Sequence, residues 1–226
     1  MTGFTAAYSG ARARIQELGE TTPEAVLDTM VPACPEWTVK ELLAHLCGVA
    51  ADSIASDLRG VGSPEWTAKQ VHARRDRPLN EIFAEWNSIA AQIEPGLDGI
   101  HPTLASALIG DAITHEHDLR GALGRDGARD SDGLAIALAY YVRRFGKRLK
   151  DARLPTILVK TGEQQELTAG LEQPIGHVAG SPFEMLRALT GRRTLDEVKG
   201  LDWSVDAAPY LELFPTYPPT QDSLNE

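Results

Sequence analysis

The sequence predicts an α+β protein, with an antiparallel four-helix bundle over residues 1–150 and a smaller α/β domain over residues 151–226. Three observations lead to this prediction. Apolar residues recur at helical spacing through the first two thirds of the chain. Helix-start and helix-stop signals divide that part into separate helices. After Leu154 the pattern changes to short runs rich in β-branched residues, which favour strands.

The four bundle helices are expected at residues 4–18, 38–59, 79–93 and 101–123. The second has the clearest start, because Thr38 and Glu41 form a capping box, and Trp37 and Leu42 have the spacing of a hydrophobic staple. Residues 60–78 are expected to form a loop. No strand is expected before residue 100.

A fifth helix is expected at residues 131–153, where a basic C-terminal end complements the helix macrodipole. Short strands are then expected at residues 156–161, 165–169 and 175–179. Residues 181–184 have the pattern of a capping box and predict a helix that ends at Gly191. Thr194 and Glu197 repeat that pattern and predict one more helix start.

The charge balance excludes several classes of partner. The chain has 22 Lys and Arg residues against 32 Asp and Glu residues, a net charge of −10, which disfavours nucleic acid and anionic membranes. No apolar run approaches the roughly 20 residues of a membrane span, and the start lacks the pattern of a signal peptide. We therefore expect a cytoplasmic protein. We also expect it to be a monomer or homodimer.

The two cysteines, Cys34 and Cys47, are expected to be packing residues.

The expected fourth helix has two polar side chains on its apolar stripe. Asp111 and His115 occupy stripe positions between Leu104 and Leu108 on one side and Leu119 on the other. Residues four apart on a helix lie one turn apart, with about 5–6 Å between their Cβ atoms. A carboxylate and an imidazole at that spacing form half of a metal site.

His45 is the best candidate for a third metal ligand. It lies on the apolar side of the second helix, between Leu42 and Val49, where a buried imidazole needs a polar partner. Three protein ligands and one open position are typical of a catalytic zinc ion, and nickel and iron are alternatives. The residues alone also allow a hydrogen-bonded core histidine and a local Asp–His ion pair, in a non-catalytic binding or regulatory module.

The three residues that follow His115 in the sequence are not expected to be metal ligands. His117 lies nearly on the opposite face of the helix and cannot share the ion, so we expect it to be a surface residue or a residue that supports a ligand without binding the ion. Glu116 is expected to be exposed. Asp118 is a candidate acceptor for the second ring proton of His115, and the alternative is a solvated acid. Sequence motifs of serine hydrolases and of phosphate-binding loops are absent.

Two segments of the chain resemble the mycothiol-dependent maleylpyruvate isomerase family, which belongs to the DinB-like metal-binding four-helix bundles. The first reads CPEWTVKELLAHL at residues 34–46. The second reads AITHEHDL at residues 112–119 and is followed by ALG at 122–124. Near the end of the chain, residues 189–192 resemble the closing segment of that family. The resemblance covers essentially the whole chain and implies the same bundle with an α/β C-terminal domain.

The resemblance implies that His45 and His115 are metal ligands and that Asp111 stands where the isomerase has a glutamate. Because aspartate is one methylene shorter, the ion can shift, bind more weakly or be absent from some preparations. Arg192 is implied as the catalytic residue that binds the anionic group of the substrate. Arg193 is the alternative and the candidate for binding the cofactor, and an exposed structural arginine pair is the competing interpretation.

The implied activity is that of a transferase or cis–trans isomerase. A divalent ion with an open position would lower the pKa of mycothiol or another low-molecular-weight thiol, whose thiolate then attacks a small electrophilic molecule. The alternatives are a metal-dependent hydrolase, in which the ion activates water, and the non-catalytic binding or regulatory module.

Overall fold

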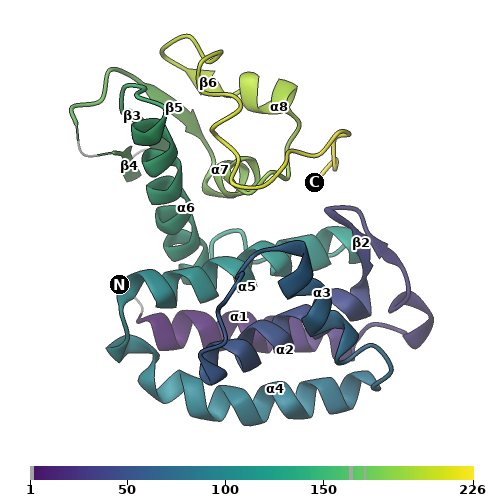
Figure 1. Cartoon of the computed structure of the whole chain (residues 1–226). Helices are drawn as coiled ribbons and strands as arrows, with labels where there is room; N and C mark the ends of the chain where they lie inside the picture. The colour runs from purple at the N-terminus through teal and green to yellow at the C-terminus, as the bar shows by residue number, and fades with distance from the viewer. Residues whose placement is uncertain (1–2, 163–164, 171) are drawn as a thin grey trace. The chain divides into compact units, whose positions relative to one another are not determined.

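The computed structural model describes residues 3–162, 165–170 and 172–226 (Figure 1). It divides into two compact units, Met1–Gly127 and Ala128–Glu226, each of which is described by itself. Within the described residues, no helix has the combined length and apolar character that crossing a membrane requires.

The first unit contains the predicted bundle. Its four long helices are α1 (Phe4–Glu20), α2 (Val39–Ala55), α4 (Leu79–Ile93) and α5 (Pro102–Leu123). Helix α1 packs against α5, and α2 packs against both α4 and α5. Trp86 is fully buried in the core of this unit, and its indole N–H donates to the hydroxyl of Tyr8 at 3.1 Å. The expectation of a helical bundle is therefore confirmed.

The start of α2 agrees with the prediction, whereas its end does not. The side chain of Thr38 accepts from the backbone N–H of Glu41 at 3.2 Å, and the Glu41 carboxylate accepts from the N–H of Thr38 at 3.0 Å. The helix ends at Ala55, four residues before the expected Arg59. The cause is Ser56, which adopts a left-handed conformation with φ of 56° and stops the helix.

A pair of strands and a helix in the first unit were not expected. A short antiparallel pair of strands, β1 (Met30–Val31) and β2 (Cys34–Thr38), precedes α2, so the expectation of no strand before residue 100 was wrong. Helix α3 (Pro64–His72) occupies part of the expected loop. Its start is encoded locally, because Ser63 caps the N–H of Trp66 and a proline stands at the first helical position. Short 3₁₀ turns at Glu24–Val26 and Glu94–Gly99 complete this unit.

The second unit combines a four-stranded sheet with three helices. Its elements are α6 (Asp132–Asp151), β3 (Ile157–Thr161), β4 (Gln165–Ala169), β5 (His177–Gly180), α7 (Pro182–Leu189), α8 (Leu195–Lys199) and β6 (Asp202–Trp203). The strand order is β4-β3-β5-β6. Strand β3 runs parallel to β5, and the two outer pairs are antiparallel. The expected α/β character of this region is confirmed.

Helix α6 belongs to the second unit, although the sequence placed it before the domain boundary near residue 150. It packs against β4 and α7. Gly146 permits α6 to lie close to the end of β4, because a Cβ atom at this position would lie 2.7 Å from the backbone nitrogen of Gly170. The change of periodicity after Leu154 thus marks the first strand of this unit, not the point where the two compact units divide.

The two predicted capping boxes of this unit differ. At α8, Thr194 and Glu197 exchange both hydrogen bonds of the box. At α7, Ser181 caps the N–H of Glu184 at 3.1 Å. The Glu184 carboxylate accepts from Arg193 at 2.8 Å. Helix α7 therefore has the cap, while the second residue of the pattern serves an ion pair.

Candidate metal centre

Helices α2 and α5 bring the three residues predicted as metal ligands together. His45 lies on α2, and Asp111 and His115 lie one turn apart on α5. The Nε2 atoms of His45 and His115 lie 3.7 Å and 3.6 Å from the Oδ1 atom of Asp111. Both histidines are buried, and the Asp111 side chain is 25% exposed. We call these three side chains the metal centre; Asp111 is its most exposed member.

The donor atoms of the metal centre fit a divalent ion. Potential ligand atoms of all three side chains lie within 4.8 Å of one another. Nitrogen and oxygen ligands of a tetrahedral zinc ion lie about 3.4 Å apart, so shifts of a few tenths of an ångström would close the measured separations around an ion. Two imidazoles and one carboxylate are a donor set that leaves one of four positions open.

Gln70 orients the first histidine. Its Oε1 atom lies 2.8 Å from Nδ1 of His45, and its Nε2 donates to the Asp52 carboxylate at 2.7 Å. Because the second contact fixes the Gln70 amide, its oxygen faces His45 and accepts the proton of Nδ1. The Nε2 atom of His45 then presents its lone pair toward Asp111. Sequence reasoning missed Gln70 because its helix, α3, was expected to be a loop; the Ser63-Pro64 cap was the available signal.

Gly48 allows α3 to come close enough for this contact. A Cβ atom at Gly48 would lie 2.5 Å from Cβ of Gln70. Any side chain at this position of α2 would therefore push Gln70 away from His45, which lies three residues earlier on the same helix. The glycine is a packing requirement of the metal centre.

Asp118 orients the second histidine. Its Oδ2 atom lies 2.9 Å from Nδ1 of His115, and the carboxylate is fully buried. Metal-bound imidazoles commonly donate their other ring proton to a carboxylate in this way. The same oxygen accepts from the thiol of Cys34 at 3.3 Å, so Cys34 makes a specific polar contact that the expected packing role did not include.

Two tryptophan rings form an aromatic wall beside the histidines. The ring of Trp37 lies 4.6 Å from that of His45 and 5.8 Å from that of His115, measured between centroids. Trp66 meets His45 edge-on at 6.4 Å. The wall restricts the space around both imidazoles. In the sequence, Trp37 was notable only as part of a helix-start signal.

Three expectations for α5 were wrong or incomplete. Glu116 is fully buried, not exposed, because its carboxylate accepts two hydrogen bonds from Arg14, at 2.8 Å and 2.7 Å, and others from Arg120. His117 is also buried, so the surface alternative was wrong. Its expected exclusion from the ligand set agrees with the two groups of potential metal ligands among the described residues, neither of which contains it. Leu104, assigned to the apolar stripe, is 52% exposed near the start of the helix.

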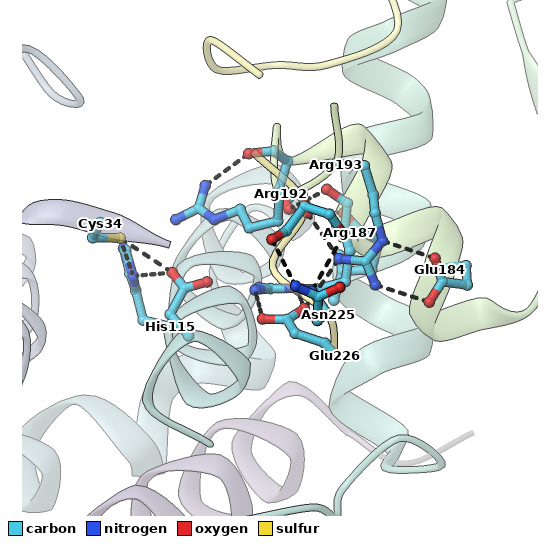
Figure 2. A network of polar contacts seen from close by, with 12 residues as sticks. Cys34, His115, Glu184, Arg187, Arg192, Arg193, Asn225 and Glu226 are labelled. Carbon is cyan, nitrogen blue, oxygen red and sulfur yellow. Dashed lines mark hydrogen bonds and ion pairs between the residues drawn. The ribbon is translucent and has the colours of Figure 1, made fainter. Parts of the chain in front are cut away.

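Arg192 and Arg193 lie in the second unit, and both are buried, so the alternative of an exposed pair was wrong. Figure 2 shows Arg193 beside Glu184 and Glu226, to which it donates at 2.8 Å and 3.1 Å. Arg187 donates from Nε to Glu226 at 2.7 Å. Arg192 donates to the backbone carbonyl of Thr190 at 2.7 Å. We call these three arginines with Glu184 and Glu226 the arginine cluster.

Comparison with known proteins supports the family resemblance of residues 34–46 and 112–124. The sequence matches the profile of the mycothiol maleylpyruvate isomerase N-terminal domain over residues 8–125, slightly more than half of the chain. No curated protein sequence matches. Two crystal structures have a similar fold: the mycothiol-dependent maleylpyruvate isomerase, at 14% identity and a TM-score of 0.61, and its histidine-to-alanine mutant, at 13% and 0.62. Each comparison covers 93% of this chain and 98% of the other. The chain therefore belongs to the mycothiol maleylpyruvate isomerase N-terminal domain family.

Proposed function

We propose that this protein is a metal-dependent, thiol-using transferase or isomerase that acts on a small electrophilic molecule. The observation that supports this proposal most is the convergence of Nε2 of His45, Nε2 of His115 and Oδ1 of Asp111, with the Asp111 side chain partly open to solvent. Family membership supports mycothiol, or a similar low-molecular-weight thiol, as the cosubstrate.

His45, Asp111 and His115 are the residues that would hold a divalent ion, with zinc favoured and nickel or iron as alternatives. Bound there, the ion supplies an open coordination position and lowers the pKa of a thiol that enters it. Gln70 and Asp118 keep both Nε2 lone pairs directed at the ion by accepting the Nδ1 protons. The ring of Trp37 lies beside both imidazoles and would limit the access of water to them.

For the anionic group of the electrophile we propose Arg192, since a guanidinium binds a carboxylate through two parallel hydrogen bonds. Arg193 is less suited to bind either substrate or thiol. Its Nε and Nη2 donate to Glu184, and its Nη1 donates to the Arg192 carbonyl and to Glu226. The two neighbours can be separated by kinetics: Arg192→Lys should raise the KM for an anionic electrophile, whereas Arg193→Lys should lower stability and leave KM unchanged.

The ligand set has a direct test. Purified protein should contain about one divalent ion per chain, and His115→Ala should remove it, as measured by elemental analysis. The matched control is His117→Ala, which changes a buried histidine of the same helix outside the metal centre and should retain the ion. Full metal content in His115→Ala would contradict the assignment.

The chemistry is tested by following the consumption of electrophiles by the metal-loaded protein over a series of added thiols, including mycothiol. The expected result is activity that requires a thiol and disappears on chelation. Activity that is indifferent to thiol but lost on chelation would replace this proposal with a hydrolase, in which the ion activates water. An occupied centre without activity toward any thiol and electrophile would favour the non-catalytic binding module.

A further inference from the structure

A second set of ligand atoms lies on the other side of the His115 ring. Cys34 Sγ lies 3.3 Å from Oδ2 of Asp118 and 4.0 Å from Nδ1 of His115. The distance from Oδ2 of Asp118 to Nδ1 of His115 is 2.9 Å. Figure 2 shows Cys34 next to His115. A thiol, a carboxylate and an imidazole nitrogen therefore meet at one place within the first unit.

We propose that Cys34, Asp118 and His115 form a second metal site, selective for thiophilic divalent ions, which we call the thiolate site. Around a tetrahedral zinc ion, a sulfur ligand lies about 3.6 Å from a nitrogen or oxygen ligand, and nitrogen and oxygen ligands lie about 3.4 Å apart. Each measured separation differs from these values by about half an ångström or less. Small side-chain rotations would therefore place all three atoms on one ion.

The position of the three residues suits an ion that arrives from solvent. Cys34 lies on β2 and is half-buried, so it is the most accessible of the three residues. Asp118 is fully buried, and His115 is 7% exposed. Once the thiol has lost its proton to solvent, the thiolate and the buried carboxylate are two negative charges that attract a cation. The sulfur ligand favours soft ions over magnesium or calcium, which prefer oxygen ligands.

His115 connects the thiolate site to the metal centre. A neutral imidazole has one protonated and one unprotonated ring nitrogen, so it offers one lone pair to a metal. The metal centre uses Nε2, and the thiolate site uses Nδ1. Occupation of one site by a neutral His115 therefore prevents its use by the other. A soft ion at the thiolate site should remove His115 from the metal centre and inhibit any activity that depends on it.

The thiolate site is tested in a protein whose metal centre has been removed. His45→Ala eliminates a ligand of the metal centre and none of the thiolate site. On titration with Co²⁺, this variant should bind about one ion per chain and develop the ultraviolet thiolate-to-cobalt charge-transfer band. The band should be lost in His45→Ala/Cys34→Ser.

Cys47 provides the matched control. It is fully buried and donates to the carbonyl of Ile82 at 3.6 Å, and burial raises the pKa of its thiol to about 11. His45→Ala/Cys47→Ser should therefore keep the full band. A band that survives without Cys34, or no band in a His45→Ala protein with the circular dichroism of the wild type, would overturn the proposal.

Two further measurements separate this inference from the proposed function. If His45→Ala does not fold, Asp111→Asn serves as the second variant. It removes a ligand of the metal centre at a partly exposed position and leaves the three ligands of the thiolate site unchanged. The Ni²⁺ content of the wild type is compared with that of His45→Ala. The part of the content that is lost with His45 measures the ion held by the metal centre. Absence of that content together with a Cys34-dependent cobalt band would defeat the proposed ligand set and support the thiolate site.

Discussion

The metal centre and the arginine cluster are both polar groups of mostly buried side chains, but their atoms are arranged in opposite ways. In the metal centre, three lone-pair-bearing atoms of His45, Asp111 and His115 face one another, an arrangement that a shared cation stabilises. In the arginine cluster, guanidinium N–H groups of Arg187 and Arg193 face carboxylates. Burial of polar side chains thus does not by itself indicate a ligand site. The proposed ligand set rests instead on the convergence of acceptor atoms.

The strongest test of this contrast is Glu226→Gln. The Glu226 carboxylate accepts from Arg187, which is fully buried, and from Arg193, so its neutralisation removes a negative charge shared by both guanidiniums and leaves Arg193 with Glu184. Breaking a buried ion pair from one side typically costs about 3–5 kcal/mol. Denaturant unfolding should show a loss of that size, while metal content should stay at the wild-type level.

Glu184→Gln is the matched control within the same cluster. Glu184 also pairs with Arg193, but its side chain is 38% exposed, so solvent can replace much of the interaction. Its loss should cost about 0.2–1 kcal/mol. Equal effects of the two substitutions would show that burial of the pair does not control its contribution to stability.

The second test concerns the metal centre. Gln70→Ala removes the acceptor at Nδ1 of His45 without changing a proposed ligand. Loss of such an orienting partner typically weakens metal affinity by about 10–100-fold. Competition with a chelating indicator would measure this change. Gly48→Ala should act in the same direction by displacing Gln70, and unchanged affinity in both variants would contradict the orienting role.

The smallest expected effect concerns an ion pair of the first unit that resembles the arginine cluster. Burial acts to raise the pKa of Glu85, but hydrogen bonds and charge from Arg74 and Arg77 outweigh it, and the pKa is lowered from its usual 4.5. A lowered pKa in the folded state contributes stability above the unfolded pKa, and this contribution is lost as the pH falls through the folded value.

The free energy of unfolding of the wild type should therefore exceed that of Glu85→Gln at pH 7 by about 0.2–1 kcal/mol, as for other partly exposed pairs. The difference should shrink as the pH falls below 4.5. A difference that is constant between pH 7 and pH 3 would mean that the charge of Glu85 is not its source.

Local signals made much of the fold predictable. The start of α2 at Thr38 and the cap of α7 at Ser181 follow from capping side chains that bond to nearby backbone. The end of α2 was not predictable in this way, because a left-handed conformation at a serine has no strong sequence signature. The membership of α6 in the second unit depends on packing between distant segments, which helical periodicity does not encode.

The candidate site was predictable where a polar side chain interrupts the apolar stripe of a predicted helix. Asp111 and His115 were predicted as ligands because they are polar residues at apolar stripe positions. The same argument applies to His45. Gln70 and Cys34 could not be found by this argument. Gln70 lies on a nine-residue helix in a segment taken for a loop, and Cys34 reaches Asp118 across 84 positions of sequence. Contacts of that range depend on tertiary packing.

All proposed ligands of the metal centre lie on α2 and α5, and this has a thermodynamic consequence. An ion that binds only the folded arrangement stabilises it by mass action, by about 2.7 kcal/mol at a free concentration of one hundred times Kd. The second unit, Ala128–Glu226, contributes none of these ligands. The melting temperature of the first unit should therefore rise with the concentration of free metal, so that the ion acts as a selective stabiliser of one half of the chain.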